Sequence, residues 1–407
     1  MKIIYLHQYF NTPDMVGGTR SYEMAKRMVM AGHQVEMVTT RTDGAINGSD
    51  WVVEEVDGIR VHWLPVNYSN AMGIARRLLA FTEFARRASA YASRLQGDVV
   101  FASSTPLTIA IPGVKASKNL KVPLVFEVRD LWPEIPIAMG ALNFPFSAYL
   151  AKKLERWAYR HSDAVVTLSP GMTQGVIKTG VSERHVTCVP NSADIDLFDG
   201  AEERGRQFRS ERPWLGQRPL VLYAGTFGRV NGVNYMVELA NHMQAIDPEV
   251  RFLAVGAGAE RETVESLAQE MGVLNENFFI EDPVSKKEVP TLFSAATVCT
   301  SWVINLRELW NNSANKVFDA LAAGRPVAIN HGGWQKDLIE EHDIGVALPA
   351  LDTKAAAREL AEFLGNDEQV LKAGEGARTL ANSRFSRDQL AGKLIAVLEN
   401  AVAKRDE

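Results

Sequence analysis

Residues 305–330 have types and spacing suited to binding a phosphate group. A polar loop leads into the run ANKVFDALAAG at residues 314–324, which predicts a helix stopped by a glycine. Ser313 or Asn312 is the candidate cap, and Lys316 stands where a capping box would place Glu or Gln. The first-turn amides are therefore free to bind an anion, which the helix N-terminus favours.

Lys316 and Asp319 extend this candidate site along one face of the same helix. Lys316 adds a mobile positive charge at the helix start. A carboxylate one turn behind a phosphate site is well placed to accept hydrogen bonds from ribose hydroxyls. The pattern thus predicts a nucleotide site, and the alternative is a solvated helix start leading into a buried helix.

A second candidate binding loop follows the first predicted strand, residues 2–6. It contains Gly17 and Gly18, which would let the backbone approach a ligand at the carboxyl edge of a parallel sheet. Turns also use glycine pairs, so an ordinary loop is the alternative.

The order of predicted elements places these residues in two α/β domains. Strand, glycine loop, helix and strand open the chain, which is typical of a doubly wound parallel sheet. Further units, including a hairpin-like run at 53–65, complete a first domain over 1–198. The polar run 199–218 predicts a linker, and the same pattern restarts in a second domain over 219–384. An amphipathic helix at about 385–404 could pack back on the first domain.

The composition excludes several classes of protein. The 407 residues are 46% apolar and 23% charged, as in soluble globular proteins of two domains. Cys188 and Cys299 lie in apolar strand-like runs, so we expect a reducing compartment and no disulfide framework. No metal-binding spacing appears, and we expect no metal. The N-terminus lacks a signal-peptide pattern and no apolar run reaches spanning length, so we expect a cytoplasmic protein.

The net charge of −5 hides a basic region. Residues 70–160 contain 13 Lys and Arg against 6 Asp and Glu, a local balance of +7, so the remainder carries −12. A regional patch of this kind does not predict duplex nucleic acid as a partner. Within it, the predicted helix 72–95 could lie on an anionic membrane, or it could be an ordinary helix with its arginines in water. Its basic and apolar residues are Arg76, Arg77, Arg86, Arg87, Arg94, Leu78, Leu79, Phe81 and Phe84.

Six short motifs are spread in order over almost the whole chain. They are Gly17-Gly18, Gly32-His33-Gln34-Val35, Asp163-Ala164-Val165-Val166 with Ser169, Val189-Pro190-Asn191-Ser192-Ala193-Asp194 with Phe198, Gly225 with Gly232, and Asp319 to Val327. Together they resemble the retaining glycosyltransferases of family 4, which have the GT-B fold. The resemblance implies two doubly wound Rossmann-like domains facing a central cleft, the first binding the acceptor and the second binding the nucleotide sugar. The runs from Asp130 to Glu134 and from Tyr223 to Thr226 are most similar to transferases that build bacterial O-antigen and capsule repeat units, often with amino or deoxy sugars.

Several positions depart from the family's pattern. Asn311 and Asp319 stand for its two glutamates, Thr226 and Asn231 for the Arg and Lys of its donor loop, and Arg129 for its histidine. The nearest cations that could substitute are Arg229 and Lys316.

The resemblance implies a role for each site residue. Lys316, Arg229 and the free amides would stabilise the negative charge of the leaving nucleoside diphosphate, and no metal is then required. Asp130 or Glu134 could orient or deprotonate an acceptor hydroxyl. Alternatively, Asp130 caps a helix or pairs with Arg129. The expected donor-binding residues are Gly17, Gly18, Gly225, Thr226, Val284, Ser285, Ser313, Asn315, Lys316 and Asp319, with Val284 and Ser285 at the base and Asp319 at the ribose.

The expected reaction moves a hexose from a UDP-sugar to a lipid-linked or free saccharide with retention at the anomeric carbon. The UDP-sugar is a co-substrate, so no cofactor is expected. The basic region favours an acceptor on a lipid diphosphate and peripheral contact with the inner face of the cytoplasmic membrane. Three alternatives are open. A nucleotide-sugar 2-epimerase of similar architecture would act on the donor alone, and a binding subunit would show no turnover. A dinucleotide dehydrogenase is disfavoured because no GxGxxG motif opens the first helix.

Overall fold

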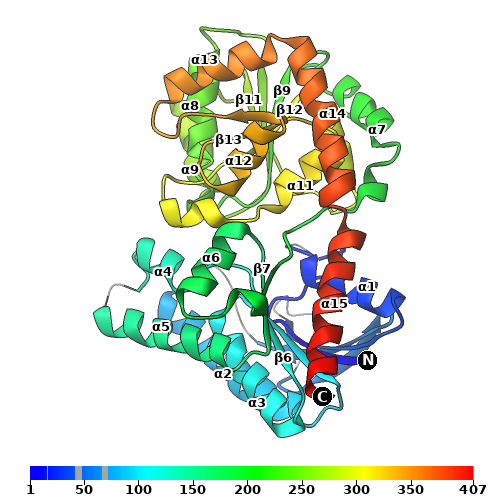
Figure 1. The fold of residues 1–407 in the computed structure, drawn as a ribbon. Helices are drawn as coiled ribbons and strands as arrows, with labels where there is room; N and C mark the ends of the chain where they lie inside the picture. Colours follow the sequence, from blue (N-terminus) through cyan, green and yellow to red (C-terminus); the bar gives the residue numbers. More distant parts are fainter. Residues whose placement is uncertain (16, 42–47, 67–71, 143, 407) are drawn as a thin grey trace. The chain divides into compact units, whose positions relative to one another are not determined.

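The computed structural model describes residues 1–15, 17–41, 48–66, 72–142 and 144–406. They form two compact units, one of Met1–Pro190 with Asp388–Glu407 and one of Asn191–Arg387. Each unit has a parallel sheet with helices on both of its faces (Figure 1). The prediction of two doubly wound α/β domains is therefore confirmed.

The first unit is built, within the described residues, on an eight-stranded sheet in the order β3-β4-β2-β1-β5-β6-β7-β8. All neighbouring strands are parallel except β3 and β4, which form the predicted hairpin around Asp57 and Gly58. Both turn residues have positive φ, 48° and 79°, as a two-residue hairpin requires. The strands are β1 (Lys2–Leu6), β2 (Gln34–Arg41), β3 (Val52–Val56), β4 (Ile59–Pro65), β5 (Val99–Ser103), β6 (Leu124–Val128), β7 (Ala164–Thr167) and β8 (Val186–Cys188).

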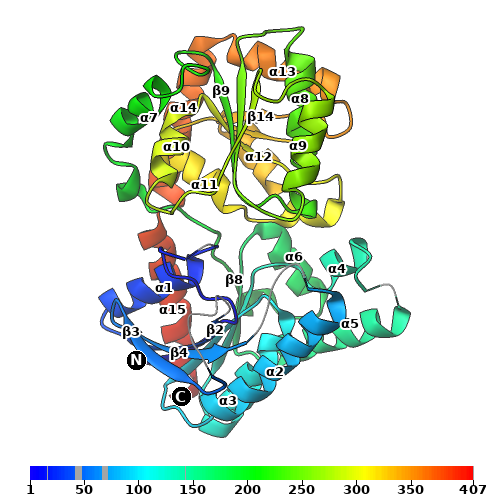
Figure 2. The ribbon, with the colours of Figure 1, turned by 180° about the vertical axis from the view of Figure 1, so that it is seen from behind.

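Helices cover both faces of this sheet, and α2 and α3 pack against each other (Figure 2). Inner strands such as β1 and β5 read as continuous apolar runs because that part of the sheet is buried on both sides. The helices are α1 (Arg20–Met30), α2 (Ile74–Ala92), α3 (Ala110–Leu120), α4 (Glu134–Ala138), α5 (Pro145–Arg160), α6 (Pro170–Lys178) and α15 (Arg387–Asp406), with 3₁₀ turns η1 (Leu107–Ile109) and η2 (Glu183–His185).

The second unit has a sheet whose described strands are all parallel, in the order β11-β10-β9-β12-β13-β14. The strands are β9 (Leu220–Ala224), β10 (Arg251–Val255), β11 (Phe278–Glu281), β12 (Val298–Ser301), β13 (Val327–Ile329) and β14 (Gly345–Ala347). The helices are α7 (Ala201–Ser210), α8 (Asn234–Met243), α9 (Arg261–Glu270), α10 (Val289–Ala295), α11 (Asn315–Ala322), α12 (Trp334–Glu341), α13 (Thr353–Leu364) and α14 (Asp367–Arg384), with η3 (Ile195–Phe198), η4 (Arg229–Asn231) and η5 (Arg307–Asn311).

The division between the units differs from the predicted one. Residues 191–198 belong to the second unit, where Asp194 accepts a hydrogen bond from Arg387 at 2.8 Å. The predicted linker, 199–218, contains the helix α7, which packs against α10. Their backbones approach so closely that a Cβ at Gly205 would lie 2.8 Å from the backbone of α10. The polar composition of this segment predicted a linker and not a helix, because the residues on the outer face of α7 are exposed to water.

The C-terminal helix α15 packs on the first unit. The guanidinium of Arg27 on α1 lies 2.6 Å from the carboxylate of Asp388, and His33 lies 3.5 Å from Glu399. Along the helix, Leu394 and Leu398 are fully buried. The chain therefore completes its first unit with its last twenty or so residues.

Candidate functional site

Lys316, in the first turn of α11, lies where its charge is poorly solvated. Its Nζ lies 4.0 Å from the centre of the Tyr223 ring. A Cβ at Gly225 would approach this Nζ to 2.9 Å, so a side chain there would displace the ammonium group. Burial lowers the pKa of Lys316 to about 7, and within the described chain no ion pair offsets this. The structure thus brings the predicted residues Lys316 and Gly225 together. Thr226 joins them because its carbonyl accepts a 2.7 Å hydrogen bond from the Tyr223 hydroxyl.

The start of α11 differs in one respect from the prediction. Its N-cap is Ala314, and no side chain caps the first turn, so neither Ser313 nor Asn312 has the expected role. Ser313 is buried, and its Oγ accepts a hydrogen bond from the backbone of Asn191 at 3.1 Å. Sequence could not show this because the two residues are far apart in the chain. The consequence is that the first-turn amides are uncapped, while the Ser313 Oγ accepts a hydrogen bond from outside the helix. At the other end, Gly324 has φ 62° and stops the helix as predicted.

Asp319, the predicted ribose ligand, is buried and paired with Lys286. The Lys286 Nζ lies 3.0 and 3.1 Å from the two carboxylate oxygens. Lys286 was missed from the sequence, although it directly follows the segment predicted to hold the base. The ion pair ties the loop after β11 to α11, and it brings Val284 and Ser285 to the same end of the sheet as Asp319.

Of the other predicted donor residues in this unit, Asn315 is exposed as the first residue of α11, Ser285 is exposed in the loop after β11, and Val284 beside it is half-buried. Ser285 donates from its N and Oγ to Glu288, at 3.1 and 2.7 Å, and these bonds hold the pKa of Glu288 below its usual range. Arg229 is exposed on η4, in the loop that follows β9. Because all strands are parallel, the loops after β9, β11 and β12 share the carboxyl edge, where such sheets bind ligands.

Several buried polar atoms near η5 have no hydrogen-bond partner among the described residues. They are Trp310 Nε1, Asn312 Oδ1, His331 Nε2 and the side-chain amide of Gln335. Buried polar atoms are nearly always hydrogen-bonded, so such a group points to a polar ligand at this edge. These residues could not be predicted as a group from the sequence, because they come from separate segments.

In the first unit, the glycine pair lies between β1 and α1. Gly17 has φ 133°, and a Cβ there would lie 2.5 Å from the side-chain amide of Asn11. Gly18 is exposed. The loop therefore needs glycine at position 17, and α1 begins directly after it with no side-chain cap.

Asp130 and Glu134 lie close to the carboxyl end of β6. Asp130 neither caps a helix nor forms an ion pair within the described residues; Thr105 donates to it at 3.2 Å. Burial raises its pKa, although Arg129 and Thr105 act against this. Glu134 has one buried carboxylate oxygen without a partner in the described structure. Glu155 on α5, missed from the sequence, has its pKa raised to about 7 by burial and by Glu134.

Arg129, which stands for the family's histidine, contacts a histidine from another strand end. Its Nη1 lies 2.9 Å from His7 Nε2, while His7 Nδ1 lies 3.1 Å from the Ser103 carbonyl. Burial and Arg129 lower the pKa of His7 to about 3, so its ring is neutral and accepts from Arg129. Sequence reasoning missed His7, although it directly follows the first strand.

The described part of the chain contains no cluster of three or more His, Cys, Asp or Glu side chains arranged to hold a metal ion. None of its helices is both long and apolar enough to cross a bilayer.

Comparison with protein families covers most of the chain. Residues 17–192 match the family described as "Glycosyl transferase 4-like domain", and residues 206–380 match "Glycosyl transferases group 1". Both are glycosyltransferase families, so the chain is a transferase enzyme.

Individual proteins agree with this. The chain is 24% identical over 282 residues to the putative colanic acid biosynthesis glycosyl transferase WcaI of Escherichia coli, covering 66% of this chain and 69% of that one. It is 25% identical to the alpha-D-kanosaminyltransferase of Streptomyces kanamyceticus, covering 68% and 71%.

Solved structures share the fold over nearly the full length. A sucrose-phosphate synthase from Thermosynechococcus elongatus superposes with a TM-score of 0.78 at 18% identity, covering 99% of each chain. Anabaena HepE, solved with UDP and glucose, gives 0.71 at 16% identity, covering 98% of this chain and 100% of that one. With two family matches in sequence, this fold and the motifs described above, the chain belongs to the family 4 glycosyltransferases of the GT-B fold.

Proposed function

We propose that this enzyme is a retaining hexosyltransferase that uses a UDP-sugar and a saccharide acceptor carried on a lipid diphosphate, in bacterial O-antigen or related polysaccharide biosynthesis. The membership of the family supports hexosyl transfer in polysaccharide biosynthesis. UDP as the nucleotide is supported by HepE, which was solved with UDP-glucose. The observation that carries the proposal is the Lys316 ammonium, held against Gly225 without a carboxylate partner in the described chain.

The donor chemistry follows from that ammonium group. As the bond from the sugar to the diphosphate breaks, negative charge grows on the diphosphate. Lys316, the uncapped amides of α11 and the exposed Arg229 would stabilise that charge, without need of a metal. Asp319, oriented by Lys286, would accept hydrogen bonds from the ribose, and the loop at Val284 and Ser285 would contact the base.

The acceptor chemistry is assigned to the first unit. Asp130 is oriented by Thr105, and Glu134 carries a buried oxygen free to accept a hydrogen bond. Either carboxylate could orient the attacking hydroxyl or remove its proton. Burial raises the pKa of Asp130, so its carboxylate holds a proton more readily than an aspartate in water would.

A lipid-linked acceptor is supported by the outer face of α5. Phe144, Phe146, Tyr149 and Leu150 are 77%, 70%, 61% and 47% exposed. Lys152, Lys153 and Arg156 are exposed on the same helix. Aromatic and basic residues at one helix surface suit the boundary of an anionic bilayer.

Lys316→Ala tests the donor site. We expect the rate of transfer from UDP-sugar to fall by about 10²–10³-fold, because one preorganised contact to the leaving group is lost. Lys354→Ala, an exposed lysine on α13, is the matched control and should retain full activity. The anomeric configuration of the product, read by NMR, tests retention. Full activity of a folded Lys316→Ala enzyme would contradict the donor site, and an inverted product would contradict the mechanism.

A further inference from the structure

The second unit contains a cavity of about 710 Å³ away from the carboxyl edge of its sheet. Its wall includes Gln217, Thr297 and Pro326, which precede β9, β12 and β13. These residues lie at the amino ends of parallel strands, whereas Gly225 and Lys316 lie near the carboxyl ends. The cavity is therefore separate from the donor site.

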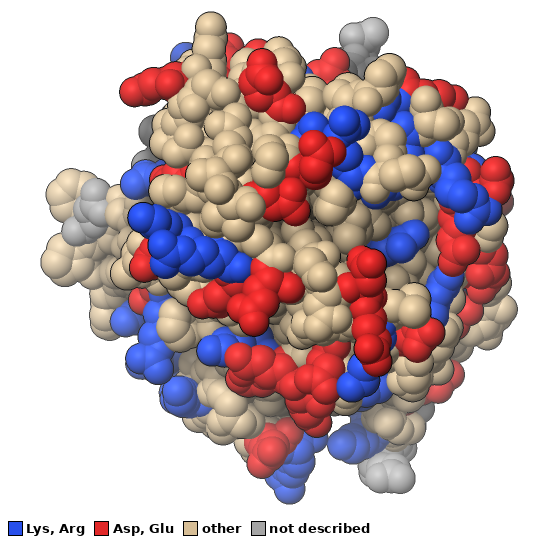
Figure 3. All heavy atoms as spheres, turned by 90° about the horizontal axis from the view of Figure 1, so that it is seen from above, with Lys and Arg blue, Asp and Glu red and all other residues tan. Residues whose placement is uncertain are grey.

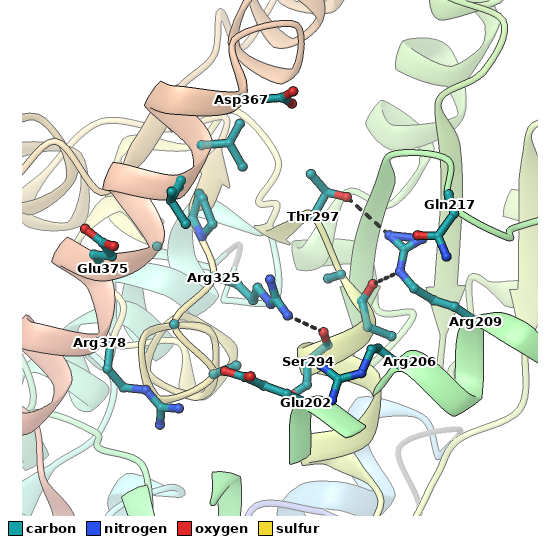
Figure 4. Close-up of a pocket in the computed structure, with 18 of the residues that line it drawn as sticks. Glu202, Arg206, Arg209, Gln217, Ser294, Thr297, Arg325, Asp367, Glu375 and Arg378 are labelled. Atoms are coloured by element: carbon teal, nitrogen blue, oxygen red, sulfur yellow. Dashed lines mark hydrogen bonds between the residues drawn. The ribbon is translucent and has the colours of Figure 1, made fainter. Parts of the chain in front are cut away.

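Three arginines line this cavity without a carboxylate partner in the described chain. Figure 4 shows Arg325 in its middle, Arg209 on the side of α7 and Arg378 on α14. No ion pair within 4 Å joins any of them to an acidic group of the described residues. Burial and the charge of Arg325 lower the pKa of Arg209, which means that the two cations repel each other.

The arginines are oriented by carbonyl groups at the ends of neighbouring helices. Arg209 donates to the carbonyl of Ala295 at 2.9 Å, Arg325 to that of Ser294 at 2.6 Å, and Arg378 to that of Ala322 at 2.6 Å. Arg325 Nε is buried and has no partner within the described structure. Arg209 also donates to the carbonyls of Gly216 and Arg218 at 2.9 Å, and its Nη2 lies 3.4 Å from the Thr297 hydroxyl, so most of its donors are used. Arg325 and Arg378 are held in position with more donors left for a ligand.

The rest of the wall has two kinds of surface. Val370, Leu371 and Pro326 make an apolar side, and three exposed carboxylates, those of Glu202, Asp367 and Glu375, stand at the rim. Carboxylates at this place would accept hydrogen bonds from hydroxyl groups. The close packing of α14 forms part of this wall, because a Cβ at Gly374 would lie 2.6 Å from the carbonyl of Gly324.

We propose that this cavity binds a small phosphorylated sugar, with the phosphate at Arg325 and Arg378 and the hydroxyls toward the carboxylate rim. A phosphate monoester supplies the negative charge that the arginines lack, and charge-assisted bonds to guanidinium groups are strong. The volume is within the range of small-molecule sites. Figure 3 shows acidic and basic residues mixed over the face that is seen from above.

Binding can be measured by calorimetry with glucose 6-phosphate, and with glucose and inorganic phosphate as comparison probes, in the presence of saturating UDP. We expect glucose 6-phosphate to bind, and glucose and phosphate to bind at least about tenfold more weakly. Arg325→Met should weaken binding by at least about tenfold, since a charged hydrogen-bond donor is lost. Lys316→Met, in the donor site, should leave it unchanged.

A second variant guards against loss of folding in Arg325→Met. Leu371 is 65% exposed, so Leu371→Trp should fold and should weaken binding by filling the mouth of the cavity. Leu371→Ala is its control and should bind normally. If Arg325→Met and Leu371→Trp both bound glucose 6-phosphate as tightly as the wild type, or if Lys316→Met lost binding, the proposal would be overturned. If the wild type bound inorganic phosphate as tightly as glucose 6-phosphate, the assignment to a sugar phosphate would be overturned.

Discussion

The ammonium group of Lys316 lies in surroundings that disfavour its charge. Burial lowers its pKa to about 7, so at pH 8 much of it is neutral in the free enzyme. The ring face of Tyr223 gives partial compensation, and a diphosphate would give far more. The residue is therefore suited to gain its proton when an anion arrives.

We predict that UDP binding at pH 8 takes up a proton through Lys316. The folded free enzyme holds this proton below pH 7 and loses it above, whereas the complex should keep it to higher pH. Affinity for UDP should therefore fall by up to about tenfold per pH unit above pH 7. Calorimetry in buffers of different ionisation enthalpy measures the uptake. If Lys316→Met still took up a proton on binding UDP at pH 8, this role of Lys316 would be contradicted.

Glu155 offers a test of stability at the residue scale. Burial and Glu134 raise its pKa to about 7 from an ordinary 4.5. Its carboxyl therefore stabilises the fold when protonated, an advantage that is complete below about pH 4.5 and is lost as the pH rises through 7. The shift corresponds to about 3 kcal/mol.

Glu155→Gln should be up to about 3 kcal/mol more stable than the wild type at pH 8, with almost no difference at pH 4. Urea unfolding at the two pH values measures this. Glu183→Gln, an exposed residue, is the control and should show no such pH dependence. Equal stability of Glu155→Gln and the wild type at pH 8 would show that Glu155 ionises without cost.

At the scale of elements, α5 and α2 are the parts of the first unit suited to a membrane surface. α3 packs against both of them. The sequence singled out the helix at 72–95, but in the structure Phe81 and Phe84 are buried, and Leu78 and Leu79 are exposed. The larger exposed apolar surface is on α5, which the sequence analysis did not consider.

We predict that binding to vesicles with anionic lipid depends on α5 more than on α2. Each basic residue at the surface contributes about 1 kcal/mol, so Lys152→Glu with Lys153→Glu should weaken binding by at least about tenfold, and Phe146→Ser should weaken it further. Arg76→Glu tests α2. Lys354→Glu in the second unit is the control. If vesicle binding did not change with salt concentration or with the α5 substitutions, this surface would be ruled out.

At the scale of the whole molecule, the first unit depends on both ends of the chain. α15 covers α1 and buries Leu390, Leu394 and Leu398. Each buried leucine contributes about 1.5–3 kcal/mol. The second unit, Asn191–Arg387, contains its own sheet and core and makes no use of this helix beyond Arg387.

Truncation after Arg387 should therefore destabilise the first unit selectively. Limited proteolysis with mass spectrometry should show early cleavage within residues 1–190, while the second unit persists as a fragment. Leu394→Ala should act in the same direction, by about 2–5 kcal/mol. Val402→Ala, less buried on the same helix, is the comparison and should have a smaller effect. If the protease cleaved the first unit at the same rate in the truncated and the full-length protein, the first unit would not depend on α15.

The sequence by itself determined the two α/β domains, the order of their elements, the hairpin that joins β3 to β4 and the helix that carries Lys316 in its first turn. These features follow from apolar periodicity, glycine positions and short motifs, all of which are local. Tertiary structure decided the rest. Lys286 against Asp319, Ser313 against Asn191, His7 against Arg129 and the arginine-lined cavity each join residues from distant segments. Local patterns do not encode such contacts, because they depend on how strands and helices pack once the sheets have formed.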